Sequence, residues 1–153
     1  MDWFLSNYVN NIDSKGRVSV PASFRQVIAA RGIRDLFAMR SLALPVMEVG
    51  GPDLLERFER QMDTQDPFSE AYQDLALFAY GDGAYLKFDA EGRIVVTDFI
   101  RSHTGITDKV AFVGTRKYFQ LWEPARFEAA RSEARARLLA TSPGGRASAG
   151  APE

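Results

Sequence analysis

The sequence lacks cysteine altogether and contains a single histidine, His103. Without cysteine the chain forms no disulfide and no thiolate metal site, a composition consistent with a reducing cytoplasm. One histidine without cysteine also argues against a transition-metal site and against a nucleophile–base pair built on imidazole. We therefore expect no metal, no cofactor and no catalytic residue.

Long apolar runs and phosphate-binding loops are missing as well. No apolar stretch approaches the roughly 18 residues that span a bilayer. The first residues, MDWFLSNYV, include an early acid and no basic segment, which is not the pattern of a signal peptide. No glycine-rich loop of the Walker or Rossmann type is present. These absences predict a protein with no membrane partner and no small-molecule substrate.

Charge is nearly balanced over the whole chain but unevenly distributed along it. The net charge is −1, yet residues 1–40 carry six basic and three acidic side chains, and residues 87–153 carry eleven and eight. Residues 41–86 between them carry two basic and nine acidic side chains. The balance argues against indiscriminate binding of nucleic acid but allows a locally basic face.

The most informative feature present is an internal duplication. The stretch NIDSKGRVSVPASFR at residues 11–25 returns as KFDAEGRIVVTDFIR at residues 87–101, with a constant offset of 76. A unit that occurs twice places two copies of the same chemistry in pseudo-symmetric positions. Both copies contain the motif Asp-x-x-Gly-Arg.

Hydrophobic patterning predicts an α+β fold with the same order of elements in both copies. We expect a strand before each motif (residues 3–12 and 84–88), a valine-rich strand after it, and then a short helix that is opened by Pro21 in the first copy and capped by Thr97 or Asp98 in the second. Two further strands follow in each copy, at residues 36–39 and 44–49 and at residues 110–114 and 118–122.

The predicted organisation comprises five segments. A first repeat at 1–50 and a second repeat at 81–125 are separated by a helical insert at 51–80, which contains the apolar stripe of PDLLERFERQM. A C-terminal helix at 126–140 follows the second repeat. The segment 141–153 is rich in small residues and poor in apolar ones, so we expect a disordered tail.

The motif itself has two interpretations. The five-residue span crosses a hairpin, so the aspartate and the arginine return within reach of each other and could simply stabilise the turn. An exposed arginine held by a carboxylate is also pre-oriented for a phosphate or a guanine edge. Lys15 and Arg25 add positive charge near the first motif, whereas Glu91 stands in the second copy at the position of Lys15.

The doubled motif, the Val-x-Val-Pro-Ala-x-Phe-Arg that follows the first copy, and the later Phe-Gln-Leu-Trp-Glu closely resemble the MraZ family. This resemblance covers about residues 1–140. It implies a bacterial, nucleoid-associated transcriptional regulator of the division and cell-wall gene cluster, with AbrB-like halves that form a swapped-hairpin β-barrel. It also implies ring-like homo-oligomers that bind repeated sites in double-stranded DNA. Thr97-Asp98 and Glu91 depart from the family pattern and predict a lesser DNA role for the second copy.

Three other classes of protein share some of these features. Two repeats that each donate one aspartate superficially resemble an aspartic protease, but an adjacent arginine keeps each carboxylate ionised and opposes proton sharing. A different AbrB-like module, such as an antitoxin, and a pure assembly scaffold remain alternatives.

The predicted roles follow from the duplicated motif and its surroundings. We expect the DNA contacts to come from Lys15, Arg17 and Arg25, with Arg93 secondary, and the motifs to be shaped by Asp13, Gly16, Asp89 and Gly92.

Overall fold

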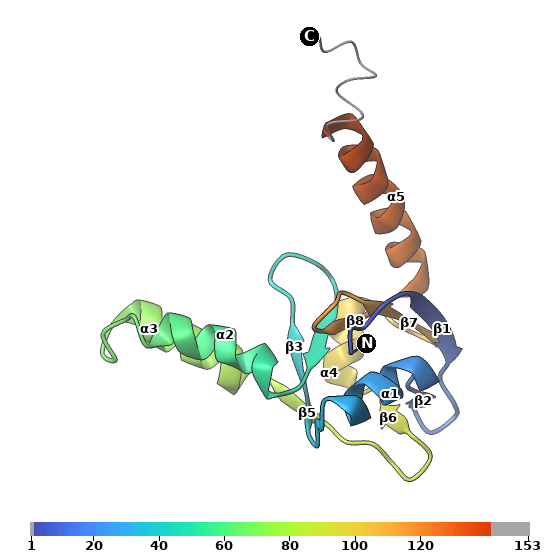
Figure 1. Ribbon diagram of the computed structural model, residues 1–153, viewed down its shortest axis with the longest axis horizontal. Helices are drawn as coiled ribbons and strands as arrows, with labels where there is room; N and C mark the ends of the chain where they lie inside the picture. Colours follow the sequence, from blue (N-terminus) through green and yellow to red (C-terminus); the bar gives the residue numbers. More distant parts are fainter. Residues whose placement is uncertain (1, 142–153) are drawn as a thin grey trace. The chain divides into compact units, whose positions relative to one another are not determined.

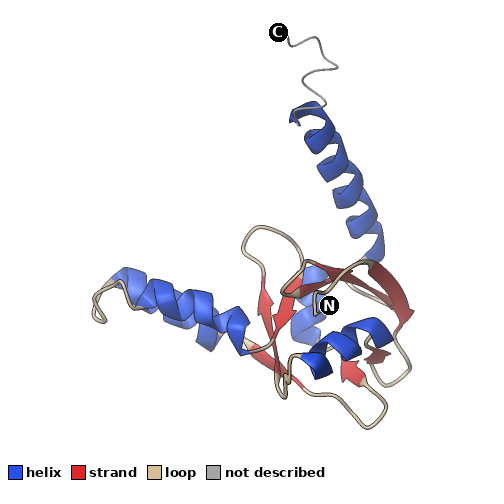
Figure 2. Ribbon diagram, viewed as in Figure 1, coloured by secondary structure: helices blue, strands red, loops and turns tan. Residues whose placement is uncertain are grey.

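The computed structural model describes residues 2–141 and has an α+β architecture (Figures 1 and 2). It divides into two compact units, Met1–Glu123 and Pro124–Glu153, each of which is considered by itself. The elements of the first unit are, in order, β1 (Asn7–Asn11), β2 (Arg17–Ser19), α1 (Ala22–Ala30), β3 (Leu36–Arg40), β4 (Met47–Gly50), α2 (Pro52–Met62), α3 (Glu70–Ala76), a π-helical turn (Leu77–Gly81), β5 (Ala84–Leu86), β6 (Arg93–Val95), α4 (Asp98–Thr104), β7 (Lys109–Gly114) and β8 (Phe119–Trp122).

Six strands form one antiparallel sheet in the order β1-β7-β8-β4-β3-β5. The order is symmetric: β1 of the first repeat pairs with β7 of the second, and β5 of the second repeat pairs with β3 of the first. At the centre β4 pairs with β8, with Glu48 opposite Gln120. Each repeat therefore completes the sheet of the other. Among the described strands β1 and β5 are the sheet edges and do not pair with each other, so backbone pairing does not close this sheet into a barrel.

The remaining two strands, β2 and β6, form a separate antiparallel ribbon. Val18 lies opposite Ile94 at its centre, and both side chains are buried. Because successive side chains of a strand point to opposite faces, Arg17 and Arg93 lie on the other, outward face of the ribbon. Figure 1 shows the loops that precede β2 and β6 close to this ribbon.

Helices α1 and α4 are the repeat-related helices and contribute to the main core. Phe24 on α1 and Ile100 on α4, which are equivalent in the duplication, are each 1% exposed. The Phe24 ring contacts the rings of Phe4 and Phe119 at centroid distances of 5.3 and 5.1 Å. The Thr97 hydroxyl accepts a hydrogen bond from Ile100 N, which confirms its predicted capping role.

The insert between the repeats forms a pair of helices, α2 and α3, that run side by side (Figure 1). Leu54 of α2 packs with Met39 of β3 and Ala79 of the π-helical turn in a second, smaller hydrophobic cluster. The second helix of the insert, α3, is capped by Ser69, whose hydroxyl accepts from Tyr72 N, and its end widens into the π-helical turn.

The second unit contains α5 (Pro124–Thr141), which agrees with the predicted C-terminal helix and carries an Arg131–Glu128 ion pair at 2.6 Å. Within residues 2–141, no helix is both long and apolar enough to cross a membrane. Apart from Thr141, the predicted tail at 141–153 lies outside the described residues.

Candidate nucleic-acid interface

The first Asp-x-x-Gly-Arg motif forms a tight turn between β1 and β2. Asp13 N donates to Arg17 O at 2.8 Å, and Gly16 N donates to Asp13 O at 3.0 Å. Gly16 has φ +79°, a left-handed conformation that glycine adopts without strain. The Asp13 carboxylate accepts from the backbone N–H groups of Lys15 and Arg17, both at 2.9 Å, and from Arg17 Nε at 2.8 Å. The turn thus fixes the Arg17 guanidinium and leaves Lys15 exposed.

The second motif has the same backbone but a different electrostatic surrounding. Asp89 accepts from Glu91 N at 2.9 Å, from Arg93 N at 3.0 Å and from Arg93 Nε at 2.7 Å, and Gly92 has φ +77°. Arg93 also lies 3.5 Å from a Glu91 carboxylate oxygen and 3.9 Å from one of Asp13. Its guanidinium is therefore near three carboxylates. Among residues 2–141 the reciprocal ion pair, Arg17 with Asp89, does not form.

Both aspartates are held in the ionised state. The backbone N–H of Arg17, followed by its guanidinium, lowers the pKa of Asp13 to about 2. The backbone N–H of Arg93 lowers the pKa of Asp89, and the hydrogen bond to Asp89 raises the pKa of Arg93. A catalytic pair of carboxylates that shares a proton would need one raised pKa instead. The carboxylates are suited to orienting guanidinium groups rather than to acid–base chemistry.

The ribbon joins the two turns to each other. Val20 N donates to Gly92 O at 3.1 Å, and Val96 N donates to Gly16 O at 2.8 Å. Each turn therefore lies against the end of the strand that follows the other turn. At about 3.4 Å per residue, the four residue steps from Gly92 to Val96 separate the turns by about 14 Å.

Arg25 lies against the second turn, although it belongs to the first repeat. Its Nε donates to Val20 O at 3.1 Å, and a Cβ built on Gly92 would come within 2.7 Å of Arg25 Cδ. The equivalent Arg101 makes the corresponding bond from Nε to Val96 O at 3.4 Å and a further one from Nη1 to Thr107 O. The sequence predicted that Arg25 lies near the first motif. Its position against the second turn depends on the pairing of β2 with β6, which the sequence pattern does not reveal.

Two other arginines of the first repeat have structural partners. Arg31 donates from Nε to Asp2 O at 2.7 Å and from Nη2 to Arg116 O at 3.1 Å, and its guanidinium lies 4.9 Å from the Phe4 ring centroid. Arg40 forms two hydrogen bonds with Asp82, each 2.8 Å long. These interactions hold the N-terminal segment and the start of the second repeat in place, away from the two turns.

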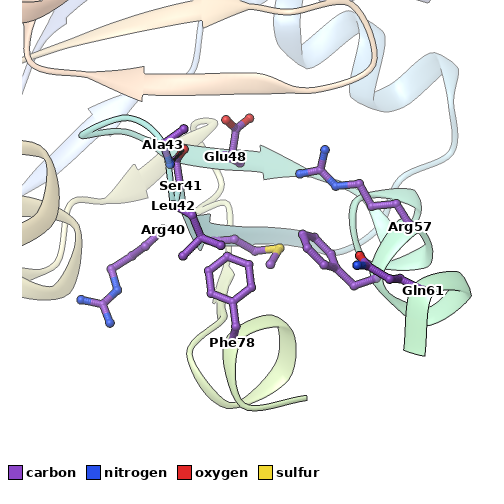
Figure 3. Close-up of a pocket in the computed structure, with 10 residues that line it drawn as sticks. Arg40, Ser41, Leu42, Ala43, Glu48, Arg57, Gln61 and Phe78 are labelled. Atoms are coloured by element: carbon purple, nitrogen blue, oxygen red, sulfur yellow. Dashed lines mark hydrogen bonds between the residues drawn. The ribbon is translucent and has the colours of Figure 1, made fainter. Parts of the chain in front are cut away.

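A pocket lies away from the turns, where the loop after β3 meets α2 and the π-helical turn (Figure 3). Phe78 and Arg57 approach it from different helical elements (Figure 3). Glu48 accepts from Gln120 Nε2 at 2.9 Å, and Arg57 stacks on the rings of Phe58 and Tyr118 at 4.9 and 5.2 Å. These polar groups are engaged in structural contacts and include no nucleophile–base pair. Within residues 2–141, no cluster of three His, Asp or Glu side chains could hold a metal ion.

Comparisons with known proteins give one consistent result. A sequence model of the family described as "MraZ protein, putative antitoxin-like" matches residues 81–142. The transcriptional regulator MraZ of Rhizobium johnstonii is 53% identical over 135 residues, which cover 88% of this chain and 93% of the relative. The proteins of that name from Xanthobacter autotrophicus and Parvibaculum lavamentivorans are each 43% identical; the matches cover 90% of this chain and 88% and 86% of the relatives. Similarity of this extent establishes common ancestry along most of the chain.

Proposed function

The chain belongs to the MraZ family of transcriptional regulators, which are not enzymes, and on that premise we propose that it binds DNA sequence-specifically through its Asp-x-x-Gly-Arg turns. The observation that carries the proposal is the geometry of the first turn. Asp13 holds Arg17 by its Nε and Nη2 atoms, both at 2.8 Å, on a surface turn that also exposes Lys15. A guanidinium fixed in this way loses little conformational entropy when it contacts a guanine edge or a phosphate.

The residues divide into contacting and orienting groups. Arg17 makes the leading base or phosphate contact, with Lys15 and Arg25 in support. Arg93 is secondary because three carboxylates already lie near its guanidinium and only 22% of its side chain is exposed, against 30% for Arg17. Asp13 and Asp89 orient these arginines and do not touch DNA themselves.

The regulator acts as a ring-like homo-oligomer on repeated promoter sites of the division and cell-wall gene cluster. Each copy contributes a small contact, and linkage of the copies raises the affinity through effective concentration. In this proposal each chain is one AbrB-like swapped-hairpin unit, built from repeats at 1–50 and 81–125, whose six-stranded sheet stays open between β1 and β5 instead of closing into the expected barrel. The protein works in the cytoplasm on the nucleoid. The exchange of β1 and β5 between the repeats supports the swapped arrangement.

Replacement of Arg17 tests the proposal. A specific duplex is first selected from a random DNA library with the unmodified protein. Arg17→Ala should then weaken binding to that duplex by about 1–3 kcal/mol if it removes a bidentate base contact. Arg93→Ala is the matched variant and should cost less.

The measurement is a quantitative gel-shift titration, with size-exclusion chromatography to verify that the oligomer is intact. If an intact Arg17→Ala oligomer binds the duplex with unchanged affinity, Arg17 does not contact the DNA. A loss for Arg93→Ala that equals or exceeds it would show that both turns contribute alike.

A further inference from the structure

The third residue of each turn differs in charge between the two repeats. Lys15 and Glu91 occupy equivalent positions, since the backbone N–H of each donates to the Oδ1 atom of the motif aspartate at 2.9 Å. Both side chains are exposed, and 72% of the Glu91 side chain is accessible to solvent. The pseudo-symmetric ribbon therefore presents a cation at one end and an anion at the other.

Glu91 is only loosely engaged within its own turn. Its carboxylate lies 3.5 Å from Arg93 Nη2, whereas the Asp89 carboxylate lies 2.7 Å from Arg93 Nε. Charge-assisted hydrogen bonds of this kind are normally about 2.7–2.9 Å long. Asp89 alone is thus sufficient to hold Arg93, and Glu91 retains capacity to accept hydrogen bonds from a ligand.

Lysine and glutamate select opposite features of the major groove. A lysine donates to the O6 and N7 acceptors of guanine, whereas a glutamate repels phosphates and accepts from the N4 amino group of cytosine. On the basis of the proposed DNA-binding function, we propose that Glu91 is a specificity-determining residue. The first turn selects guanine through Lys15, and the second turn selects cytosine through Glu91.

The symmetry of the ribbon converts this difference into a prediction about the DNA. Equivalent residues related by the pseudo-two-fold axis contact opposite strands, and the turns are about 14 Å apart, or about four base pairs at 3.4 Å each. The cytosine that the second turn selects on one strand pairs with a guanine on the other strand. The strand whose guanine is selected by the first turn therefore carries two guanines. The preferred element is therefore a non-palindromic G…G pair rather than the palindromic G…C pair that two lysines would select.

The test is selection of preferred duplexes from a random library by the full chain and by its Glu91→Lys and Glu91→Gln variants, followed by fluorescence-anisotropy titrations at several salt concentrations. The exposed position tolerates lysine, because the first turn carries one on the same backbone. Glu91→Lys should shift the preference from G…G to G…C by about 5- to 150-fold in relative affinity, and Glu91→Gln should shift it toward adenine at the second position. Lys15→Glu is the matched reversal and should change the base selected by the first turn.

Three results would overturn the inference, and they separate it from the proposed function. If Glu91→Lys strengthens binding to all duplexes equally and steepens the salt dependence by about one counterion without changing the preferred bases, Glu91 only repels phosphate. If the unmodified chain already selects a palindromic element, the inference fails and the DNA-binding function stands. If the unmodified chain selects no sequence at all, both fail.

Discussion

The two Asp-x-x-Gly-Arg turns share a backbone and an outward-facing arginine but differ in the charges that surround that arginine. Their Asp–Arg hydrogen bonds agree to within 0.1 Å, and the two glycines have φ angles of +79° and +77°. Yet Arg17 is paired with one carboxylate, whereas Arg93 lies near three. Duplication has preserved the local geometry that a few hydrogen bonds enforce and has left the surface charge free to diverge.

The same contrast extends to the helices behind the turns. Phe24 of α1 and Ile100 of α4 are equally buried at equivalent positions, but the Phe24 ring lies within 6.5 Å of four other aromatic rings. The aromatic part of the main core is therefore built around the helix of the first repeat.

Truncation of these two core residues gives the largest expected difference between the repeats. Phe24→Ala should lower the free energy of unfolding by about 3–5 kcal/mol, because it leaves a cavity among packed rings. Ile100→Ala removes fewer carbon atoms and should cost less, toward the lower part of the range of about 2–5 kcal/mol for such truncations. Urea unfolding followed by circular dichroism measures both, and equal losses would show that the two halves of the core are energetically equivalent.

Local sequence patterns predicted most of the fold. The apolar stripe of residues 52–62 predicted a helix there, which is α2, and the constant offset of 76 predicted the two motif turns. The strand expected at 3–12 is shorter, because Ser6 has φ +77° and Phe4 instead pairs with Arg116 in an isolated bridge. That break follows from the approach of the N-terminal segment to Gly114, a contact between distant residues that no local pattern reports.

The candidate site divides in the same way between local and non-local causes. The Asp13–Arg17 pairing was predictable, because both residues lie within one five-residue turn. The place of Arg25 against Gly92 was not, because it depends on the ribbon formed by the two repeats. The separate roles of Arg31 and Arg40 likewise depend on partners that lie far along the chain.

Replacement of Gly16 and Gly92 by alanine tests whether the two turns have different neighbours. Gly16→Ala and Gly92→Ala should each lower the free energy of unfolding by about 1–2 kcal/mol, because both positions have positive φ. Only at Gly92 does the new Cβ meet Arg25, at 2.7 Å from its Cδ, so only Gly92→Ala should displace that side chain. Thermal unfolding measures the first effect, and DNA titration of the folded variants measures the second. Equal DNA affinities of the two variants would show that Arg25 does not contribute to DNA binding.

The smallest expected difference lies in the response of the two turns to acid. The pKa of Asp13 is lowered from 3.8 to about 2, and the pKa of Asp89 is also lowered. A carboxyl group with a depressed pKa in the folded state stabilises the fold above its unfolded pKa, and this contribution is lost as the pH falls through the folded pKa. The stability supplied by Asp13 should therefore be complete above about pH 4 and decline toward pH 2 and below. For Asp89, burial raises the pKa and has a larger influence than the side-chain hydrogen bond from Arg93, so we expect the weaker effect there.

Asp13→Asn should flatten the pH dependence of unfolding between pH 4 and 2 more than Asp89→Asn does. Carboxyl-carbon NMR titration measures the two pKa values directly, and a lower value at Asp89 would reverse the assignment of the more tightly held turn.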